Sequence, residues 1–159
     1  SDIRRVEAGI LNWGADMTLD TNVYAVGLDN LVDAGKRVDY IGRAALERIM
    51  AEGVKRKLAG IAIEGPRIEM NAVRWAVAAN GAGAGQVTSA LYSPRLKKNI
   101  GYAMLPVAHA ILGTALTVII PGLGARKATG TPLYKTGPIS GIIDNATGFA
   151  VTVSLAGDE

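Results

Sequence analysis

The chain contains no cysteine among its 159 residues. It therefore has no disulfide framework, no thiolate nucleophile and no cysteine-ligated zinc or iron–sulfur site. It has a single histidine, His109, with no acidic residue close to it in sequence, and we assign no metal site. Aromatic residues make up only 5% of the chain, whereas glycine occurs 20 times. This balance favours many turns over long helices.

Signals for export or membrane insertion are missing as well. We find no signal peptide and no apolar run long enough to span a bilayer, so we expect a cytoplasmic location and no membrane partner. The first residue is Ser1 instead of methionine, and we expect the chain to be a fragment of a longer protein. The net charge of +3 comes from scattered basic residues. That pattern indicates a solvated surface without a nucleic-acid partner, and it is compatible with an anionic ligand.

Helical patterns occur only in the first third of the chain. Apolar residues from Ile3 to Leu11 recur at near-helical spacing, so we predict a helix over Asp2–Leu11. A second helix is predicted after Gly42, with an apolar stripe of Leu46, Ile49 and Met50 and with Gly53 at its C-terminal end. A charged joint follows at residues 54–57, where we place a domain boundary that divides the chain into residues 1–54 and 55–159.

Strand patterns dominate the remainder, and 49% hydrophobic residues are enough for a sizeable core. We predict strands over Leu58–Ile63, Val73–Ala79, two within Gly85–Leu105, Ala115–Ile120, Ala125–Tyr134, Ile139–Ile143 and Phe149–Leu155. Short strands separated by turns indicate a barrel or a sandwich. The core should include Val87, Leu91, Ile100, Leu116 and Val118. The glycine-rich stretch 81–85 could suggest a nucleotide loop, but a strand follows it instead of a helix, so we interpret it as a turn.

The stretch Gly85–Leu105 combines two strands with one shaped corner. Residues 87–92 alternate with a period of two, and the dipeptide Ser93-Pro94 ends that run because proline cannot donate to a strand ladder. Basic residues surround Leu96 in the corner, and Asn99 carries an amide suited to binding loop backbone. The pattern G-x-V-T-S-x-x-x-S-P-x-L-x-x-N-I resembles the C-terminal barrel of the glycine-cleavage T-protein family, which are folate-dependent aminomethyl and methyl transferases.

The resemblance implies an α+β fold: a small N-terminal helical remnant of the folate-binding region, followed by an antiparallel β-barrel. It also gives Glu7 a role. Residues 5–9 with Trp13-Gly14 resemble the family motif R-x-E-x-G with an aromatic-glycine pair after it, and the glutamate of that motif binds the pterin of tetrahydrofolate. A carboxylate suits this role because its two oxygens accept parallel hydrogen bonds from an amino group and a ring N–H. The alternative is a surface helix charge with i,i+3 pairing.

Three more residues are candidates for the cofactor site. Trp13 occupies the aromatic position and either packs on the cofactor or belongs to the core. Lys36 or Arg37 lies near the place where the family has a basic residue for folate. Residues 39–43 resemble the family element D-F-I-G-R, and residues 22–28 resemble N-P-x-E-x-G-L, although Val23 and Ala25 replace its proline and glutamate.

The resemblance implies that this chain is the C-terminal portion of a tetrahydrofolate-dependent one-carbon transferase. Its partners would be the N-terminal half of the same enzyme, which holds the family's catalytic aspartate, and a methylated small-molecule substrate; we therefore assign no catalytic residue here. Residues 14–18 resemble the G-N-D-M-T of the demethylase branch and favour it. The alternatives are the glycine-cleavage aminomethyltransferase, an RNA-modification paralogue, whose cysteine motif is missing, and a non-catalytic β-barrel binding module.

Overall fold

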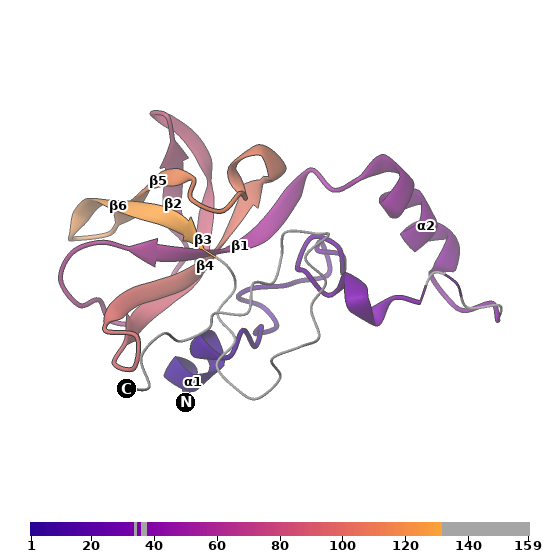
Figure 1. The fold of residues 1–159 in the computed structure, drawn as a ribbon, viewed down its shortest axis with the longest axis horizontal. Coiled ribbons are helices and arrows are strands. Elements are labelled where there is room, and N and C mark those ends of the chain that lie inside the picture. Colours follow the sequence, from indigo (N-terminus) through magenta and orange to yellow (C-terminus); the bar gives the residue numbers. More distant parts are fainter. Residues whose placement is uncertain (34, 36–37, 132–159) are drawn as a thin grey trace.

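Figure 1 shows the protein as a computed structural model, which describes residues 1–33, 35 and 38–131. The helices are α1 (Asp2–Glu7), the 3-10 helix η1 (Asp29–Leu31), α2 (Arg43–Glu52) and the 3-10 helix η2 (Val107–His109). The strands are β1 (Arg56–Ile63), β2 (Trp75–Ala79), β3 (Ala82–Ser93), β4 (Lys98–Pro106), β5 (Ala115–Ile120) and β6 (Gly124–Thr131). The strand predictions at 139–143 and 149–155, and the end of the one reaching Tyr134, lie outside the described residues.

The strands form a closed barrel in the order β1-β4-β3-β2-β5-β6, with antiparallel pairing throughout and β6 returning to β1. The α+β class with an antiparallel barrel is therefore confirmed. The turn from β2 to β3 needs only two residues, since Asn80 and Gly81 both have positive φ angles of 51° and 79°. The wider turn predicted for 81–85 is wrong, because residues 82–85 belong to β3. Gly85 is needed there because a Cβ atom would lie 2.2 Å from the Met104 carbonyl oxygen.

The buried apolar side chains form two clusters. The first fills the barrel and includes Val87, Leu116 and Val118. The second lies between the barrel wall and α1, and it consists of Val6, Leu58, Leu91, Ile100 and Tyr102. All five predicted core residues are buried, but Leu91 and Ile100 belong to the second cluster. This second cluster positions α1 against β3 and β4 (Figure 1).

Both predicted helices are present, but their bounds and packing differ from expectation. Helix α1 ends at Glu7, four residues before the predicted end, because Gly9 takes a left-handed φ of 69° and the chain turns away. Helix α2 begins after Gly42 and ends before Gly53, as predicted. None of its residues is buried, and it lies apart from the barrel (Figure 1). The apolar stripe of α2 is therefore open to contact with something outside the described residues.

Candidate functional site

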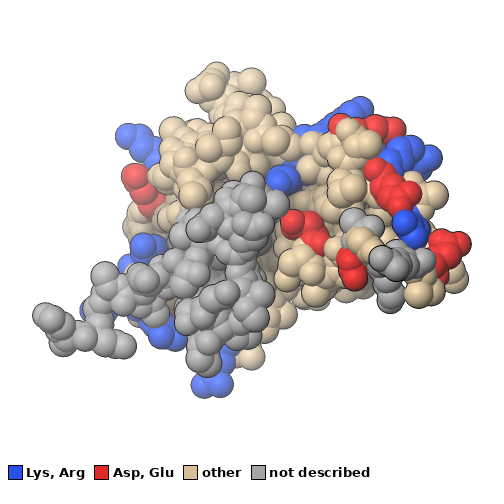
Figure 2. Space-filling view, turned by 45° about the vertical axis from the view of Figure 1, so that its right-hand side comes forward, with Lys and Arg blue, Asp and Glu red and all other residues tan. Residues whose placement is uncertain are grey.

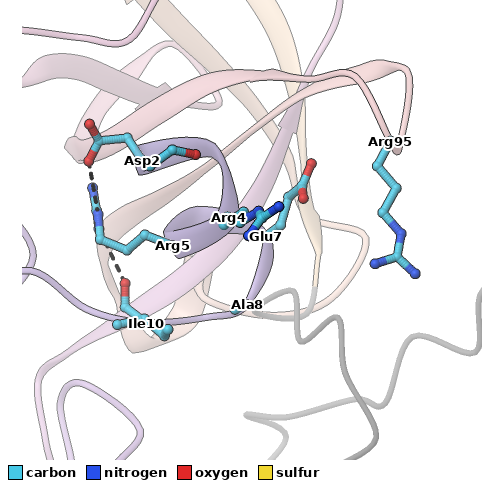
Figure 3. A pocket seen from close by; sticks show the side chains of 8 residues that line it. Asp2, Arg4, Arg5, Glu7, Ala8, Ile10 and Arg95 are labelled. Carbon is cyan, nitrogen blue, oxygen red and sulfur yellow. Dashed lines mark hydrogen bonds and ion pairs between the residues drawn. The ribbon is translucent and has the colours of Figure 1, made fainter.

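Glu7, the last residue of α1, is a buried carboxylate at the edge of a hollow. Only 6% of its surface is exposed, and its Oε1 accepts a hydrogen bond from the hydroxyl of Ser93. The interpretation as a solvated surface charge is therefore wrong. The hollow has a volume of about 960 Å³ and is lined by Ser1, Asp2, Arg4, Arg5, Glu7, Ala8, Ile10 and Arg95. Figure 3 shows the Glu7 carboxylate on the side of α1 that faces the hairpin corner carrying Arg95.

Arg5 fastens α1 to the segment that follows it and to the barrel. Its Nη1 donates to Asp16 Oδ2 at 2.8 Å and to the Ile10 carbonyl at 3.2 Å. Its Nη2 donates to the Ser89 hydroxyl of β3 at 3.1 Å, and its Nε lies 3.4 Å from Asp2 (Figure 3). Since the Arg5 head group is divided among these partners, it serves as a structural clamp beside Glu7.

Asp16 is the centre of a buried polar network between the N-terminal segment and β3. Its exposed fraction is 1%, and it accepts hydrogen bonds from the Arg5 guanidinium, the Asn12 amide and the hydroxyls of Thr88 and Ser89, the last two at 2.7 Å each. Adjacent strand residues ordinarily point to opposite faces. A β-bulge at Thr88, where the register with β4 shifts between Val87 and Ser89, turns both hydroxyls toward one carboxylate.

Tyr102 of β4 completes the attachment of α1. Its side chain is completely buried, and its hydroxyl donates to the Val6 carbonyl at 2.8 Å. Burial raises the pKa of the Tyr102 phenol well above its ordinary value, and the Asp16 carboxylate raises it further. The C-terminal end of α1, where Glu7 lies, is thus fixed by a side chain from the barrel.

Trp13 does not share the hollow with Glu7. Its exposed fraction is 61%, and it forms a single bridge with Met17 across a turn at Gly14, whose φ is +90°. The expectation that Trp13 belongs to the core is therefore wrong, and the ring remains free to pack on a ligand or on another part of the protein. The other two candidates, Lys36 and Arg37, lie outside the described residues.

Three further properties concern metal binding, membrane insertion and surface charge. In residues 1–33, 35 and 38–131, no three His, Cys, Asp or Glu side chains come together in a way that could bind a metal ion. Nor does any helix in these ranges have the length and apolarity needed to cross a bilayer. On the face drawn in Figure 2, Lys and Arg atoms occur in several separate places, with Asp and Glu among them at the α2 end.

Several residues of this site were not singled out by the sequence. Ser93 was assigned only to the hairpin corner, and Asp16 only to a motif. Their importance comes from partners distant in sequence: Ser93 and Glu7 are 86 residues apart, and Asp16 and Ser89 are 73 apart. One usable signal existed, because Ser93 and Glu7 both belong to the motifs that resemble one family. Asn99 was predicted correctly: its amide donates to the carbonyls of residues 63, 65 and 66 and accepts from the Ile68 amide.

Comparison of the chain with known proteins identifies a family and several relatives. The family model described as "Glycine cleavage T-protein C-terminal barrel domain" matches residues 56–135. An aminomethyltransferase of Synechococcus sp. is 41% identical over 136 residues, which are 84% of this chain and 36% of the relative. A dimethylsulfoniopropionate demethylase of Ruegeria pomeroyi is 35% identical over 129 residues, or 81% of this chain and 34% of the relative. The chain thus spans about a third of the length of these curated relatives.

A solved structure shares the fold. The crystal structure of the glycine cleavage system aminomethyltransferase T from Bartonella henselae superposes with a TM-score of 0.74 over 83% of this chain and 37% of that one. Its sequence identity is 24%, so this comparison supports the arrangement of helices and strands and no finer property.

Proposed function

Because this chain belongs to the glycine cleavage T-protein family, we propose that it is the C-terminal portion of a tetrahydrofolate-dependent one-carbon transferase. Residues 1–54 would complete the folate-binding domain, and residues 55–159 would form the barrel domain. Tetrahydrofolate, when bound, supplies the nitrogen that exchanges the one-carbon unit. In this proposal the hollow beside α1 takes its pterin ring.

The observation that carries this proposal is the placement of Glu7. Removing a carboxylate from water costs free energy unless hydrogen-bond donors compensate for the lost hydration. Ser93 supplies one donor, and a carboxylate has about four acceptor positions. Glu7 lines the hollow while being almost completely buried. It is therefore suited to a ligand that presents two parallel donors, and the amino group and ring N–H of a pterin are such a pair.

The remaining candidates are proposed for other parts of the cofactor. Trp13 exposes 61% of its surface and has an aromatic face available for stacking. Lys36 and Arg37 remain predictions for the anionic end of the cofactor. We assign no catalytic residue to this chain, since the family resemblance places the catalytic aspartate in the N-terminal half.

The N-terminal half of the same enzyme is the partner we propose for the open face of residues 1–54. The curated relatives are about three times as long as the matched segment, and a polypeptide of that length would contain a partner of sufficient size. Helix α2 offers it an apolar stripe, with Met50 55% exposed, and Ile41 just before the helix is completely exposed. We include no nucleic acid and no membrane among the partners, and a cytoplasmic location accords with that set.

The finer proposal is that the whole enzyme demethylates a methylated small molecule, such as a sulfonium compound. Its support is the motif at residues 14–18, together with the similarity to a dimethylsulfoniopropionate demethylase. The second candidate is an aminomethyltransferase, which is favoured by the higher identity to a protein of that name, 41% against 35%. Assaying the full-length protein with a methyl sulfonium donor and with an aminomethyl donor separates the two, because only one should give turnover.

Glu7→Gln in the full-length protein tests the folate site. The substitution keeps an oxygen for Ser93 but replaces the other acceptor with a donor, which would face a pterin donor. A hydrogen bond to a charged group contributes about 1.5–3 kcal/mol. We therefore expect tetrahydrofolate affinity to fall at least about tenfold, as about 1.4 kcal/mol is a factor of ten. Isothermal titration calorimetry measures the affinity, and the melting temperature without ligand should change little.

Glu69→Gln is the matched control, since it makes the same chemical change in a side chain that is 89% exposed. Its affinity for tetrahydrofolate should equal that of the parent. If Glu7→Gln also binds tetrahydrofolate as tightly as the parent, Glu7 is not a folate ligand and the proposed function loses its main support.

A further inference from the structure

Ser93 contacts Glu7 but is not among the residues that line the hollow. It is the last residue of β3 and has no exposed surface, so it cannot touch a ligand in the hollow itself. Its hydroxyl donates to Glu7 Oε1, and the same hydroxyl oxygen accepts the Leu96 amide N–H at 3.0 Å. A serine has one hydroxyl proton. Because the Ser93 hydroxyl donates its one proton in the hydrogen bond to Glu7, the orientation of the Glu7 carboxylate depends on the orientation of that hydroxyl.

The hairpin corner fixes Ser93 in turn. Ser93 pairs with Lys98 at the end of the β3–β4 ladder, and Pro94 follows it at the turn position where proline is favoured. Leu96, which donates to the Ser93 hydroxyl, also packs against the apolar cluster that contains Val6 of α1. The corner and the helix therefore share one packed unit, and Ser93 connects them at Glu7.

Helix α1 does not need the Ser93 bond to stay in place. Arg5 already connects it to Asp16 and Ser89, and Tyr102 holds the Val6 carbonyl. Val6 is also completely buried in the second apolar cluster. With those attachments present, the remaining freedom at this point is the rotation of the Glu7 side chain, and the Ser93 hydroxyl removes that freedom.

We propose that Ser93 is a positioning residue that holds the Glu7 carboxylate in the orientation required by the pterin ring. This inference rests on the proposed function of Glu7. Fixing a binding group before the ligand arrives reduces the conformational entropy lost on binding. Supporting hydrogen bonds behind a ligand-contacting residue act in this way. Loss of the Ser93 hydroxyl should therefore weaken pterin binding even though Ser93 never contacts the ligand.

The test is Ser93→Ala in the full-length protein, with Thr21→Ala as control. Thr21 also donates a hydroxyl hydrogen bond inside the fold, to the Thr18 carbonyl at 2.7 Å, and it is not part of the attachment of α1. Calorimetry with tetrahydrofolate and with tetrahydropterin should show an affinity loss of about tenfold for Ser93→Ala and less than about threefold for Thr21→Ala. Binding of p-aminobenzoylglutamate, which lacks the pterin, should be the same in all variants. Ser93→Thr, which keeps a hydroxyl, should restore affinity to within about threefold of the parent.

Each outcome decides between the explanations. If Glu7→Gln binds normally, the proposed function fails; if Glu7→Gln binds weakly while Ser93→Ala binds normally, only the positioning role fails. Equal losses for Ser93→Ala and Thr21→Ala, or a loss extending to p-aminobenzoylglutamate, would mean a general structural effect and overturn the inference. In a Glu7→Gln background, Ser93→Ala should cause no further loss. If Ser93→Ala does not fold, Ser93→Cys, which keeps a weak donor of similar size, is measured with the same ligands and should lose at least about threefold.

Discussion

Tyr102 shows how one side chain serves both the barrel and the site. Tyr102 is the largest fully buried side chain among the described residues, and its ring packs in the second apolar cluster while its hydroxyl donates to the Val6 carbonyl at the end of α1. Burial raises the pKa of the Tyr102 phenol well above 10.0, with Asp16 adding to the effect and Arg5 opposing it. The folded protein therefore keeps this proton more tightly than the unfolded chain does.

Stability at alkaline pH should depend on Tyr102. A folded-state pKa above the unfolded value gives stability that is complete below about pH 10 and is lost as pH rises toward the folded value. The loss should be about 1.4 kcal/mol per pH unit. Tyr102→Phe should cost about 0.5–1.5 kcal/mol at neutral pH through the lost hydrogen bond, and it should remove this alkaline component. Urea unfolding at a series of pH values measures both. Parallel stability curves for the two proteins would show that Tyr102 is not responsible.

For single residues, the sequence predicted some roles correctly but could not predict properties that depend on tertiary contacts. Glu7 was chosen because its neighbours match a motif, and the structure adds a burial that no local pattern reports. The bulge at Thr88 could not be read from the alternation of β3, because a bulge is defined by the partner strand. For Trp13 the sequence left core packing as an alternative, because an aromatic residue in a loop could belong to the core. Only the tertiary fold places it at the surface.

Helix α2 is formed by its sequence without help from a buried face. Good helix formers fill it, an Arg43–Glu47 pair at 2.8 Å supports its exposed side, and glycines with positive φ lie at both ends. The pattern that predicted the helix also predicted its apolar stripe of Leu46, Ile49 and Met50. The stripe has no buried residue in the described chain, which accords with a partner in the N-terminal half.

Met50→Ala tests that partner. Alanine preserves helix propensity, so the change removes only side-chain contacts. In this 159-residue chain, where Met50 is 55% exposed, the free energy of unfolding should change by less than about 0.5 kcal/mol. In the full-length protein, where the stripe would be covered, the cost should be about 2–5 kcal/mol. Arg48→Ala, on another face of the same helix, is the control. Equal small costs in both proteins would show that nothing covers the stripe.

Local signals were enough for most helices and strands, and they failed where the signal was ambiguous. The β3–β4 hairpin, the Asn80-Gly81 turn and the glycine ends of α2 all follow from residues adjacent in sequence. Helix α1 was predicted too long because Ile10 and Leu11 continued the spacing while Gly9 broke the backbone. Residues 81–85 were assigned to a turn because the stretch is rich in glycine and no helix follows it, yet small residues at the end of a closed barrel permit close backbone approach.

The two parts of the chain differ in how well their apolar side chains are buried. The barrel closes on itself, with β6 paired to β1, and its interior cluster is continuous. The first 54 residues instead expose many large apolar side chains, which are Ile10, Trp13, Leu19, Leu31, Val38, Ile41 and Met50. Exposed apolar area of this kind marks an interaction surface. The closed barrel, together with the exposed apolar side chains that precede it, favours our proposal of a site shared with an N-terminal half.

The chain alone should therefore catalyse no methyl transfer. In the part of the chain that the structure describes, the buried carboxylates are Glu7, which we assign to cofactor binding, and Asp16, which already accepts four hydrogen bonds. The experiment incubates the purified 159-residue chain with tetrahydrofolate and a methyl sulfonium donor and measures methyltetrahydrofolate by chromatography. A β-rich circular dichroism spectrum confirms that the chain is folded, and the full-length protein serves as the active reference. We expect product only from the full-length protein.

Product from the chain alone, if it is abolished by Glu7→Gln, would place the active site inside these residues. If the full-length protein gives no product with either a methyl or an aminomethyl donor, the result would instead favour a non-catalytic binding module.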